Sequence, residues 1–204
     1  RHGARVFSDE IHAPLAYPGA RHVPYASVSD AAAGHSVVAV STSKGWNLAG
    51  LKCAQMVLGS EADQALWRRI GMVAGHGLAG LGVIASIAAW REGGPWLDGV
   101  LDYLDGNRRR VTQWMAARLP QAGFVAPEGT YLAWIDCRGL ALPAGTTPAA
   151  FFRRHARVAM TDGAECGAAG AGFVRLNFAM PRPVLDEALA RMAGAIETLP
   201  GASG

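Results

Sequence analysis

The sequence predicts an α/β protein in which a layered sheet-and-helix part is followed by a smaller α+β domain. Three observations predict this class. The candidate strands, such as Ser36–Val40, are short and continuously apolar, which is typical of a buried sheet. Helical segments lie between them along the chain. After residue 123 the pattern changes, because a long helical segment ends there and shorter strands and helices follow.

The first part of the chain contains three candidate strands and one capped helix. The strands are expected at residues 4–8, 36–40 and 53–58. Three prolines between the first two strands keep that segment irregular. Ser60 is a good N-cap residue and Asp63 follows it three residues later, so a helix is expected from there through residue 70.

The segment from Ile70 to Trp90 contains no Asp, Glu, Lys or Arg and is long enough to span a bilayer. Against a membrane span, it holds five glycines and His76 and few large aliphatic side chains. Glycines at residues 75 and 77 interrupt a soluble helix. We therefore expect two buried helical pieces with a glycine-rich join, and no association with a membrane.

A long helix is expected to connect the two parts of the chain. Apolar residues recur at helical spacing from Trp96 to Leu119, between a Gly-Gly-Pro break and Pro120. Beyond it, strands are expected at 131–135 and 173–178, and helices at 147–155 and 183–199. The predicted domains are residues 1–93 as part of a large domain, 94–123 as the connecting helix, and 124–204 as a small C-terminal domain.

Charge and cysteine content exclude several classes of function. The net charge of +3 comes from scattered arginines, and no basic stripe is interleaved with aromatic residues, so nucleic-acid binding is not expected. The three cysteines are far apart and odd in number, which suits neither a disulfide framework nor a metal site. We therefore expect a cytoplasmic protein without a bound metal.

Lysine is rare in this chain. Lys44 and Lys52 are its only lysines, whereas it has 17 arginines. Lys44 directly follows a strand and is surrounded by small residues and hydroxyls, a setting typical of an amine nucleophile that forms a Schiff base. Arginine cannot serve there because it does not lose its proton near neutral pH. The alternative is a solvated loop lysine.

Four sequence stretches resemble one enzyme family. SDEIH at residues 8–12 and STSKGWNLAGLKCA at 41–54 resemble the class I/II aminotransferase-like, fold type I pyridoxal-phosphate enzymes. GTYLAWIDCRGL at 129–140 and GFVRLNFAMPR at 172–182 are similar to its MalY/PatB-type cystathionine β-lyase (C–S lyase) branch. The resemblance implies pyridoxal 5'-phosphate as cofactor, and a fold type I large domain plus a small α+β C-terminal domain.

The resemblance also implies the catalytic and substrate-binding residues. Lys44 corresponds to the lysine that holds the cofactor as a Schiff base and then takes the proton from the substrate Cα. Asp9 corresponds to the carboxylate that keeps the pyridine nitrogen protonated; a strand-end Asp that caps a turn is its alternative. Arg175 corresponds to the residue that clamps the substrate α-carboxylate, with a solvent-facing arginine on an edge strand as its alternative.

Four further residues are implied for the cofactor site. His12 lies where this branch has a histidine near the phenolic oxygen, although a structural histidine is the alternative. Ser41 and Ser43 are candidates for the cofactor phosphate, and Ser43 is the one that could instead only shape the turn. Lys52 stands where most relatives have an arginine that grips the phosphate. An ammonium keeps the charge but lacks the bidentate fork, so somewhat weaker cofactor binding is expected.

The implied activity is a C–S β-lyase that cleaves cystathionine or other cysteine S-conjugates to a thiol, pyruvate and ammonia. One alternative is an aminotransferase that passes the amino group to a 2-oxo acid. A second is a non-catalytic aminotransferase-like regulatory domain. The family builds its site at a homodimer interface, so self-association is expected, with residues 78–90 as the candidate contact.

The resemblance begins in the middle of the family's fold. The chain therefore looks like the C-terminal half of such an enzyme. The preceding half of the family supplies a glycine-containing turn for the phosphate and an aromatic ring that stacks on the cofactor. We expect the isolated chain to be weakly active or inactive.

Overall fold

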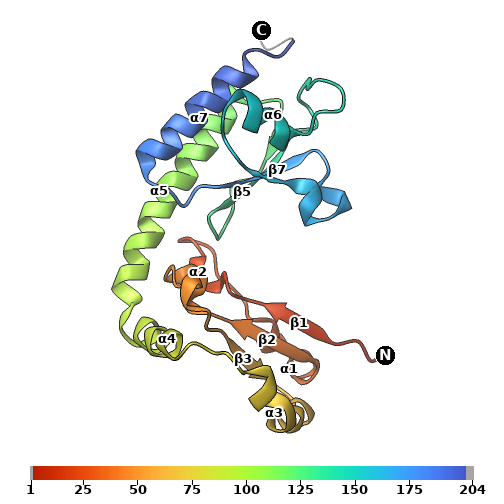
Figure 1. Cartoon of the computed structure of the whole chain (residues 1–204), viewed down its shortest axis with the longest axis vertical. Helices are drawn as coiled ribbons and strands as arrows, with labels where there is room; N and C mark the ends of the chain where they lie inside the picture. Colours follow the sequence, from red (N-terminus) through yellow and green to blue (C-terminus); the bar gives the residue numbers. More distant parts are fainter. Residues whose placement is uncertain (1, 201–204) are drawn as a thin grey trace. The chain divides into compact units, whose positions relative to one another are not determined.

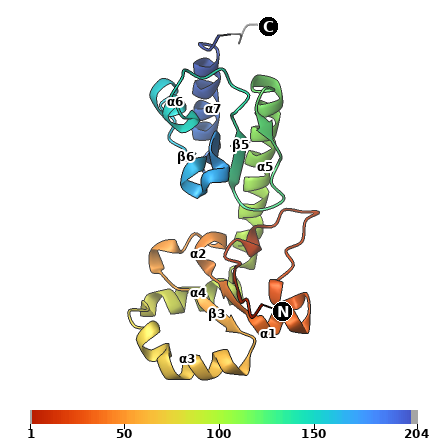
Figure 2. The same ribbon diagram turned by 90° about the vertical axis from the view of Figure 1, so that its right-hand side faces the viewer.

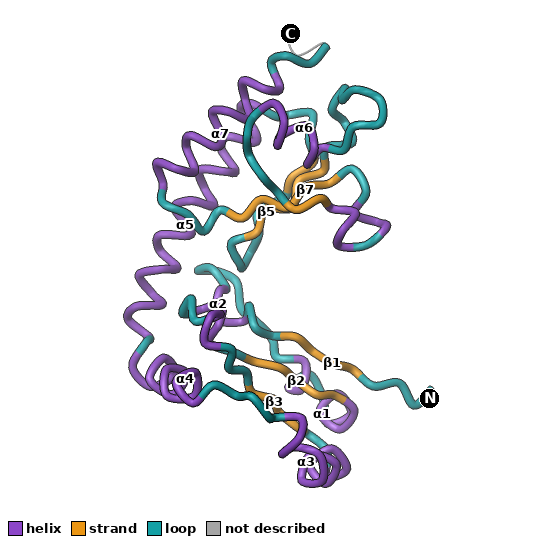
Figure 3. The backbone as a smooth tube through the Cα atoms, in the orientation of Figure 1, coloured by secondary structure: helices purple, strands orange, loops and turns teal. Residues whose placement is uncertain are grey.

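The computed structural model describes residues 2–200, and these divide into two compact units with the boundary between Leu101 and Asp102. Each unit contains its own sheet with helices packed beside it (Figure 3). The units are described one at a time below. The predicted division of the chain at residues 93 and 123 into functional domains stays a prediction.

The first unit is built on a three-stranded sheet in the order β1-β2-β3 (Figure 1). Its strands are β1 (Val6–Asp9), β2 (Ser36–Val40) and β3 (Gln55–Leu58). β1 pairs parallel to β2, and β3 pairs antiparallel to β2. All three strands were expected from their apolar runs. Between β1 and β2 lies a short helix that the sequence did not suggest, α1 (Asp30–His35), which is capped by Ser29.

Three further helices follow in this unit (Figure 2). They are α2 (Thr42–Gly45), α3 (Glu61–Ala74) and α4 (Gly80–Glu92). The Ser60 side chain caps α3 by accepting a hydrogen bond from the backbone N–H of Asp63, as expected. The join between α3 and α4 lies at residues 75–79, which confirms the predicted interruption at glycine.

The expectation that α3 and α4 are buried is wrong for this chain. Eight of their large apolar side chains are at least two-fifths exposed: Leu66, Ile70, Met72, Val73, Leu81, Ile84, Ile87 and Trp90. These helices carry apolar residues on several faces, and the first unit covers only some of those faces. Within residues 2–200, no helix has both the length and the apolar character needed to cross a membrane.

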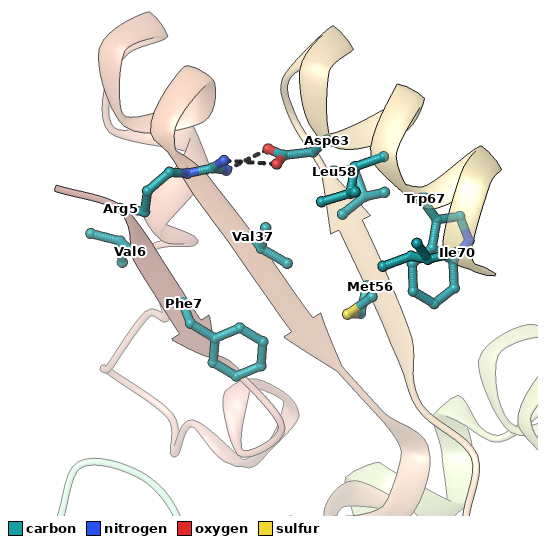
Figure 4. A pocket seen from close by; sticks show the side chains of 10 residues that line it. Arg5, Val6, Phe7, Val37, Met56, Leu58, Asp63, Trp67 and Ile70 are labelled. Atoms are coloured by element: carbon teal, nitrogen blue, oxygen red, sulfur yellow. Dashed lines mark hydrogen bonds and ion pairs between the residues drawn. The ribbon is translucent and has the colours of Figure 1, made fainter. Parts of the chain in front are cut away.

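One face of this sheet is open beside α3 (Figure 4). It holds a cavity of about 470 Å³ lined mainly by apolar side chains, among them Phe7, Met56 and Trp67. An ion pair between Arg5 and Asp63 closes one end, with nitrogen–oxygen distances of 2.8 and 2.5 Å. The hydrogen bonds from Arg5 and then from Ser60 lower the pKa of Asp63 to about 2.

The second unit contains a four-stranded antiparallel sheet in the order β4-β5-β7-β6. Its strands are β4 (Gly123–Phe124), β5 (Leu132–Asp136), β6 (Thr161–Asp162) and β7 (Phe173–Asn177). Its helices are α5 (Gly94–Arg118), which begins in the first unit, α6 (Pro148–His155) and α7 (Arg182–Ile196). The predicted helices and longer strands are confirmed. β4 and β6 are too short to show a period in the sequence.

The core of the second unit lies between its sheet and helices α5 and α7, which run side by side (Figure 1). Alternate residues of β7, Val174 and Leu176, point into this core and are fully buried or nearly so. Because side chains alternate along a strand, Arg175, which lies between these two residues, points to the other face of the sheet.

Asn107 of α5 holds the connection between β7 and α7. Its side chain is fully buried and donates hydrogen bonds to the carbonyl oxygens of Phe178 (2.9 Å) and Met180 (3.0 Å). Its Oδ1 accepts a hydrogen bond from Arg182 Nε. The amide therefore satisfies backbone groups that water cannot reach.

Replacing Asn107 with leucine is expected to lower the free energy of unfolding by about 2–4 kcal/mol, because two buried carbonyls lose their donor. Denaturant unfolding measures this loss. Asn177→Leu is the matched control, since Asn177 is exposed and its bond to the Ala179 N–H is worth about 1 kcal/mol or less. Equal losses in the two variants would contradict the role given to Asn107.

Candidate functional site

Three chain segments bring polar side chains to one edge of the first sheet. β1 and β2 are parallel, so their carboxyl ends, Asp9 and Val40, lie at the same edge. β3 is antiparallel to β2 and pairs Gln55 with Val40, so the residues that precede β3 reach this edge too. Ligands of α/β proteins commonly bind at the carboxyl ends of parallel strands. Six of the seven predicted site residues lie at or next to this edge.

Lys44 lies on α2, the single helical turn that follows β2. Ser41 begins this turn as its N-cap, accepting a hydrogen bond from the Ser43 N–H at 3.0 Å. The Lys44 side chain is half-buried. Within residues 2–200 neither lysine forms an ion pair, whereas seven arginines do: Arg5, Arg108, Arg109, Arg110, Arg118, Arg138 and Arg191. The Lys44 amine is therefore not committed to any carboxylate of the described residues.

Asp9 is the last residue of β1 and is exposed. Its Oδ1 accepts a hydrogen bond from the Ile11 N–H at 3.2 Å, so it does cap a turn, as the structural alternative requires. Its Oδ2 has no hydrogen-bond partner among the described residues, which leaves one oxygen for a ligand. His12 follows three residues later, half-buried, at the start of a 3-10 helix (Ala13–Leu15).

The two serines differ in how far their hydroxyls are already engaged. Ser41 is buried, and its Oγ lies 2.6 Å from the Cys53 carbonyl oxygen and 2.8 Å from Ser43 Oγ. Ser41 thus ties α2 to the start of β3. To donate to a phosphate it would have to release Cys53, whereas Ser43 is less buried and its hydroxyl has a single partner, Ser41, among the described residues.

Lys52 is exposed and lies just before β3, with a backbone φ of 47°. Left-handed backbone is costly for a lysine, which has a Cβ, and such residues concentrate at functional sites. Asn47 has a φ of 55°, so the loop between the two lysines is bounded by left-handed turns. Lys52 lies three residues before Gln55, which pairs with Val40, so its backbone lies near the edge that Lys44 follows.

Arg175 belongs to the second unit, so the structure places it in a different unit from the other six residues. It is half-buried in the middle of β7, and its cross-strand neighbours are Trp134 and Thr161. Its Nη2 donates a hydrogen bond to Thr161 Oγ1 at 3.3 Å. It forms no ion pair within residues 2–200, so its guanidinium can take an external carboxylate.

Sequence reasoning missed Glu10, the residue next to Asp9. Its carboxylate is buried and accepts hydrogen bonds from the Tyr25 N–H (2.8 Å) and Ser8 Oγ (3.0 Å), and it pairs with His22 Nε2 (2.8 Å). It anchors the irregular segment between β1 and α1. The available signal was a second acidic residue directly after Asp9, but the partners His22 and Tyr25 lie 12 and 15 residues further along the sequence.

The stability that Glu10 contributes is expected to depend on pH. Burial raises the pKa of Glu10, but the hydrogen bonds from His22, Tyr25 and Ser8 outweigh burial and the net shift is downward. A lowered pKa means that the contribution is present above the unfolded pKa, about 4.3, and is lost as the pH falls through the lower folded value. Glu10→Gln should therefore be destabilised by about 1–3 kcal/mol near neutral pH.

Thermal unfolding of both proteins from about pH 7 down to about pH 3 measures this dependence. The difference between wild type and Glu10→Gln should shrink at the acid end. A difference that stays constant across the range would show that the Glu10 charge is not what anchors the segment.

Comparison with protein families gives one match that spans most of the chain. The family model described as aminotransferase class I and II matches residues 1–192. The match includes both lysines, Asp9 and Arg175, and it covers every predicted site residue.

Individual relatives give the same result. Cystathionine beta-lyase of Corynebacterium glutamicum is 39% identical over 201 residues, which are 96% of this chain and 52% of that protein. A crystal structure from Corynebacterium diphtheriae is 42% identical with a TM-score of 0.90, over 97% of this chain and 52% of that chain. Cystalysin from Treponema denticola, whose structure contains pyridoxal 5'-phosphate, is 29% identical with a TM-score of 0.87, over 95% and 49%. The chain thus spans about half the length of these relatives.

Proposed function

The chain belongs to the aminotransferase class I and II family, and from this premise we propose that it forms the lysine-bearing part of a pyridoxal-phosphate-dependent C–S β-lyase. The substrate class is cystathionine or other cysteine S-conjugates, and the products are a thiol, pyruvate and ammonia. One observation carries the proposal: Lys44, half-buried and without an acidic partner among residues 2–200, follows β2 at the edge where Asp9 ends the parallel strand β1.

The groups at this edge fit the cofactor by their chemistry. An aldehyde needs an amine, which Lys44 provides. A pyridinium needs a carboxylate acceptor, and Asp9 has one oxygen without a partner among the described residues. A phosphate needs hydroxyl donors and a cation, which Ser41, Ser43 and Lys52 provide. His12, three residues after Asp9, would hydrogen-bond the phenolic oxygen.

When bound, pyridoxal phosphate supplies an electron-accepting ring that stabilises negative charge on the substrate Cα. The remaining work falls to residues of the chain. Lys44 would hold the cofactor covalently and, once the substrate displaces it, accept the Cα proton at Nζ. Asp9 would keep a proton on the ring nitrogen by accepting its hydrogen bond through Oδ2. Arg175 would orient the substrate through its carboxylate, without changing charge itself.

Covalent mapping tests the cofactor assignment. The chain is mixed with pyridoxal phosphate, reduced with borohydride and digested, and the modified lysine is located by mass spectrometry. Lys44 is expected to carry the label. Because Lys52 is the only other lysine, it serves as an internal control in every sample. A label shared equally between the two lysines would contradict the proposed site.

An aminotransferase is the second candidate function, and the description of the matching family model favours it. The two activities share their first steps and differ in what they consume. A lyase releases pyruvate from cystathionine without a 2-oxo acid, whereas an aminotransferase requires one. The assay is run on the chain and on a chimera in which the chain replaces the matching half of the C. glutamicum relative. We expect activity from the chimera and little from the chain alone.

Lys52 offers a test of phosphate binding that leaves Lys44 unchanged. Lys52→Arg is expected to tighten pyridoxal-phosphate binding by about fivefold to tenfold, because a guanidinium can bind a phosphate through two parallel hydrogen bonds. Lys52→Ala should weaken it by a similar factor or more. Absorbance titration measures both affinities. Equal affinities in all three proteins would remove Lys52 from the site.

We also infer that the protein self-associates through the predicted contact at residues 78–90, and we extend this contact to the preceding helix α3. The support is a set of strongly exposed apolar side chains on these helices, among them Met72 (89%), Val73 (77%) and Leu81 (73%). Light scattering on Leu81→Asp is expected to show a smaller mass than wild type. Val125→Asp is the control, since Val125 is 85% exposed in the second unit. A wild-type protein that stays monomeric would contradict this inference.

A cytoplasmic location completes the proposal. Its support is that all three cysteines, Cys53, Cys137 and Cys166, are free thiols, which suits a reducing compartment. Cell fractionation with an antibody against the chain tests the location directly.

A further inference from the structure

The α2 turn, which carries Lys44, is fastened to α4 at two points on one of its sides. Thr42 Oγ1 and Ser86 Oγ share a hydrogen bond of 2.9 Å, and both side chains are almost fully buried. The indole Nε1 of Trp46 donates a hydrogen bond to the Gly93 carbonyl oxygen at 2.8 Å. Trp46 also packs edge-to-face on Trp90, with ring centroids 4.8 Å apart.

The spacing of these contacts fixes the direction of Lys44. Thr42 and Trp46 are four residues apart, and the Trp46 N–H donates to the Thr42 carbonyl oxygen, so they share one side of the helical turn. Lys44 lies midway between them, and two residues along a helix is a rotation of about 200°. Fastening Thr42 and Trp46 to α4 therefore turns Lys44 to the opposite side of α2.

Small residues stand where α2 and the loop after it approach α4 most closely. A Cβ at Gly82 would collide with the Leu51 carbonyl oxygen, and a Cβ at Gly93 would collide with the Trp46 indole. Gly82, Ser86 and Gly93 are spaced by four and seven residues, so they lie along one face. The loop between the two lysines and the α2 turn are therefore both packed against the same face of α4.

From these contacts we propose that Thr42 and Trp46 are positioning residues that set the orientation of the Lys44 amine by docking α2 on α4. The inference rests on the proposed function for its meaning in catalysis, whereas the contacts that support it lie within this chain. Losing one docking contact would let the turn rotate, which exposes the amine to small reagents and takes it out of alignment with the cofactor.

The test measures two lysine reactions in Thr42→Val, which has the same shape as threonine but no hydroxyl. The first is acetylation by acetic anhydride, read as the ratio of Lys44 to Lys52 modification by mass spectrometry. We expect this ratio to rise about fivefold, the effect of one hydrogen bond. The second is attachment of pyridoxal phosphate with borohydride reduction, which should fall at Lys44 by about the same factor.

Opposite shifts in the two reactions distinguish positioning from a general loss of stability, which would move Lys44 and Lys52 together. Thr42→Ser keeps the hydroxyl and should restore wild-type ratios. Trp46→Phe, which lacks the indole N–H, should behave like Thr42→Val. Thr112→Val is the matched control, because Thr112 bonds a backbone carbonyl in α5 of the second unit, and it should change neither ratio.

A double substitution tests whether Thr42 and Ser86 act as a pair. If they do, Thr42→Val with Ser86→Ala should shift the acetylation ratio no further than either change alone. Wild-type ratios in Thr42→Val, or a Thr42→Ser protein that behaves like Thr42→Val, would overturn the proposal. Because acetylation needs no cofactor, that outcome is separate from a failure of pyridoxal phosphate to label wild-type Lys44, which would overturn the proposed function.

Discussion

Replacing Lys44 with arginine is expected to abolish covalent capture of pyridoxal phosphate while leaving the fold intact. Arginine keeps the positive charge and the length of the side chain, but its guanidinium does not lose a proton near neutral pH and forms no stable bond with an aldehyde. Borohydride labelling at position 44 should disappear. In a protein competent for lyase activity, kcat/KM should fall by about 10³-fold or more, since the same amine also takes the Cα proton.

Lys52→Arg is the matched control for Lys44→Arg, because it makes the same change at the only other lysine. It should keep the label on Lys44. Circular dichroism of both variants checks that they fold. Full lyase activity in Lys44→Arg or Lys44→Ala would contradict the catalytic role of Lys44. The remaining alternative, a non-catalytic regulatory domain, predicts instead that the protein has no lyase activity and that Lys44→Ala leaves its function intact.

The second large effect is expected at Arg175. Its guanidinium lies half-buried on β7, holds one hydrogen bond to Thr161, and has no ion-pair partner within residues 2–200. If it binds the substrate carboxylate, Arg175→Ala should lower kcat/KM by about 10²–10³-fold, the usual cost of removing one member of a hydrogen-bonded charge pair. Arg175→Lys should recover part of this loss, because it keeps the charge without the fork.

Substrate analogues make this prediction specific. The active protein or chimera is assayed with a cysteine S-conjugate and with its α-amide, which lacks the negative charge. Wild type should strongly prefer the free carboxylate, and Arg175→Ala should show almost no preference. Arg191→Ala is the control, since Arg191 is paired with Glu187 on the exposed side of α7, and its preference should match wild type. A preference that survives in Arg175→Ala would assign carboxylate binding to another residue.

Local sequence patterns were sufficient for most secondary structure. The β-branched run at Ser36–Val40 became β2 with the same bounds, and Ser60 capped α3 as its side chain suggested. The signal for each lies within a few consecutive residues, and a single sequence displays such signals directly. The short helix α1 and the strands β4 and β6 could not be predicted, because they are too brief to establish a period and depend on distant partners.

Burial could not be predicted from hydrophobicity alone. The segment from Ile70 to Trp90 is apolar enough to be a core, yet much of it is exposed in this chain. Hydrophobic side chains indicate that a surface tends to be covered, and they do not indicate by what. The chain spans about half of its relatives, and the proposed self-association is one way in which these helices become covered.

What the sequence determined by itself is the chemistry that the chain can offer: an amine in a chain that otherwise uses arginine, hydroxyls next to it, and a carboxylate and an arginine in a set order. The spacing of these groups carried the resemblance to the family. What only the tertiary structure decided is how these groups are held. The pairing of β1 with β2 brings Asp9 to the edge that Lys44 follows, and Glu10, Ser86 and Gly93 reach their partners across 12 to 47 residues of sequence. Such contacts follow from the packing of whole elements, and no local pattern of residues records them.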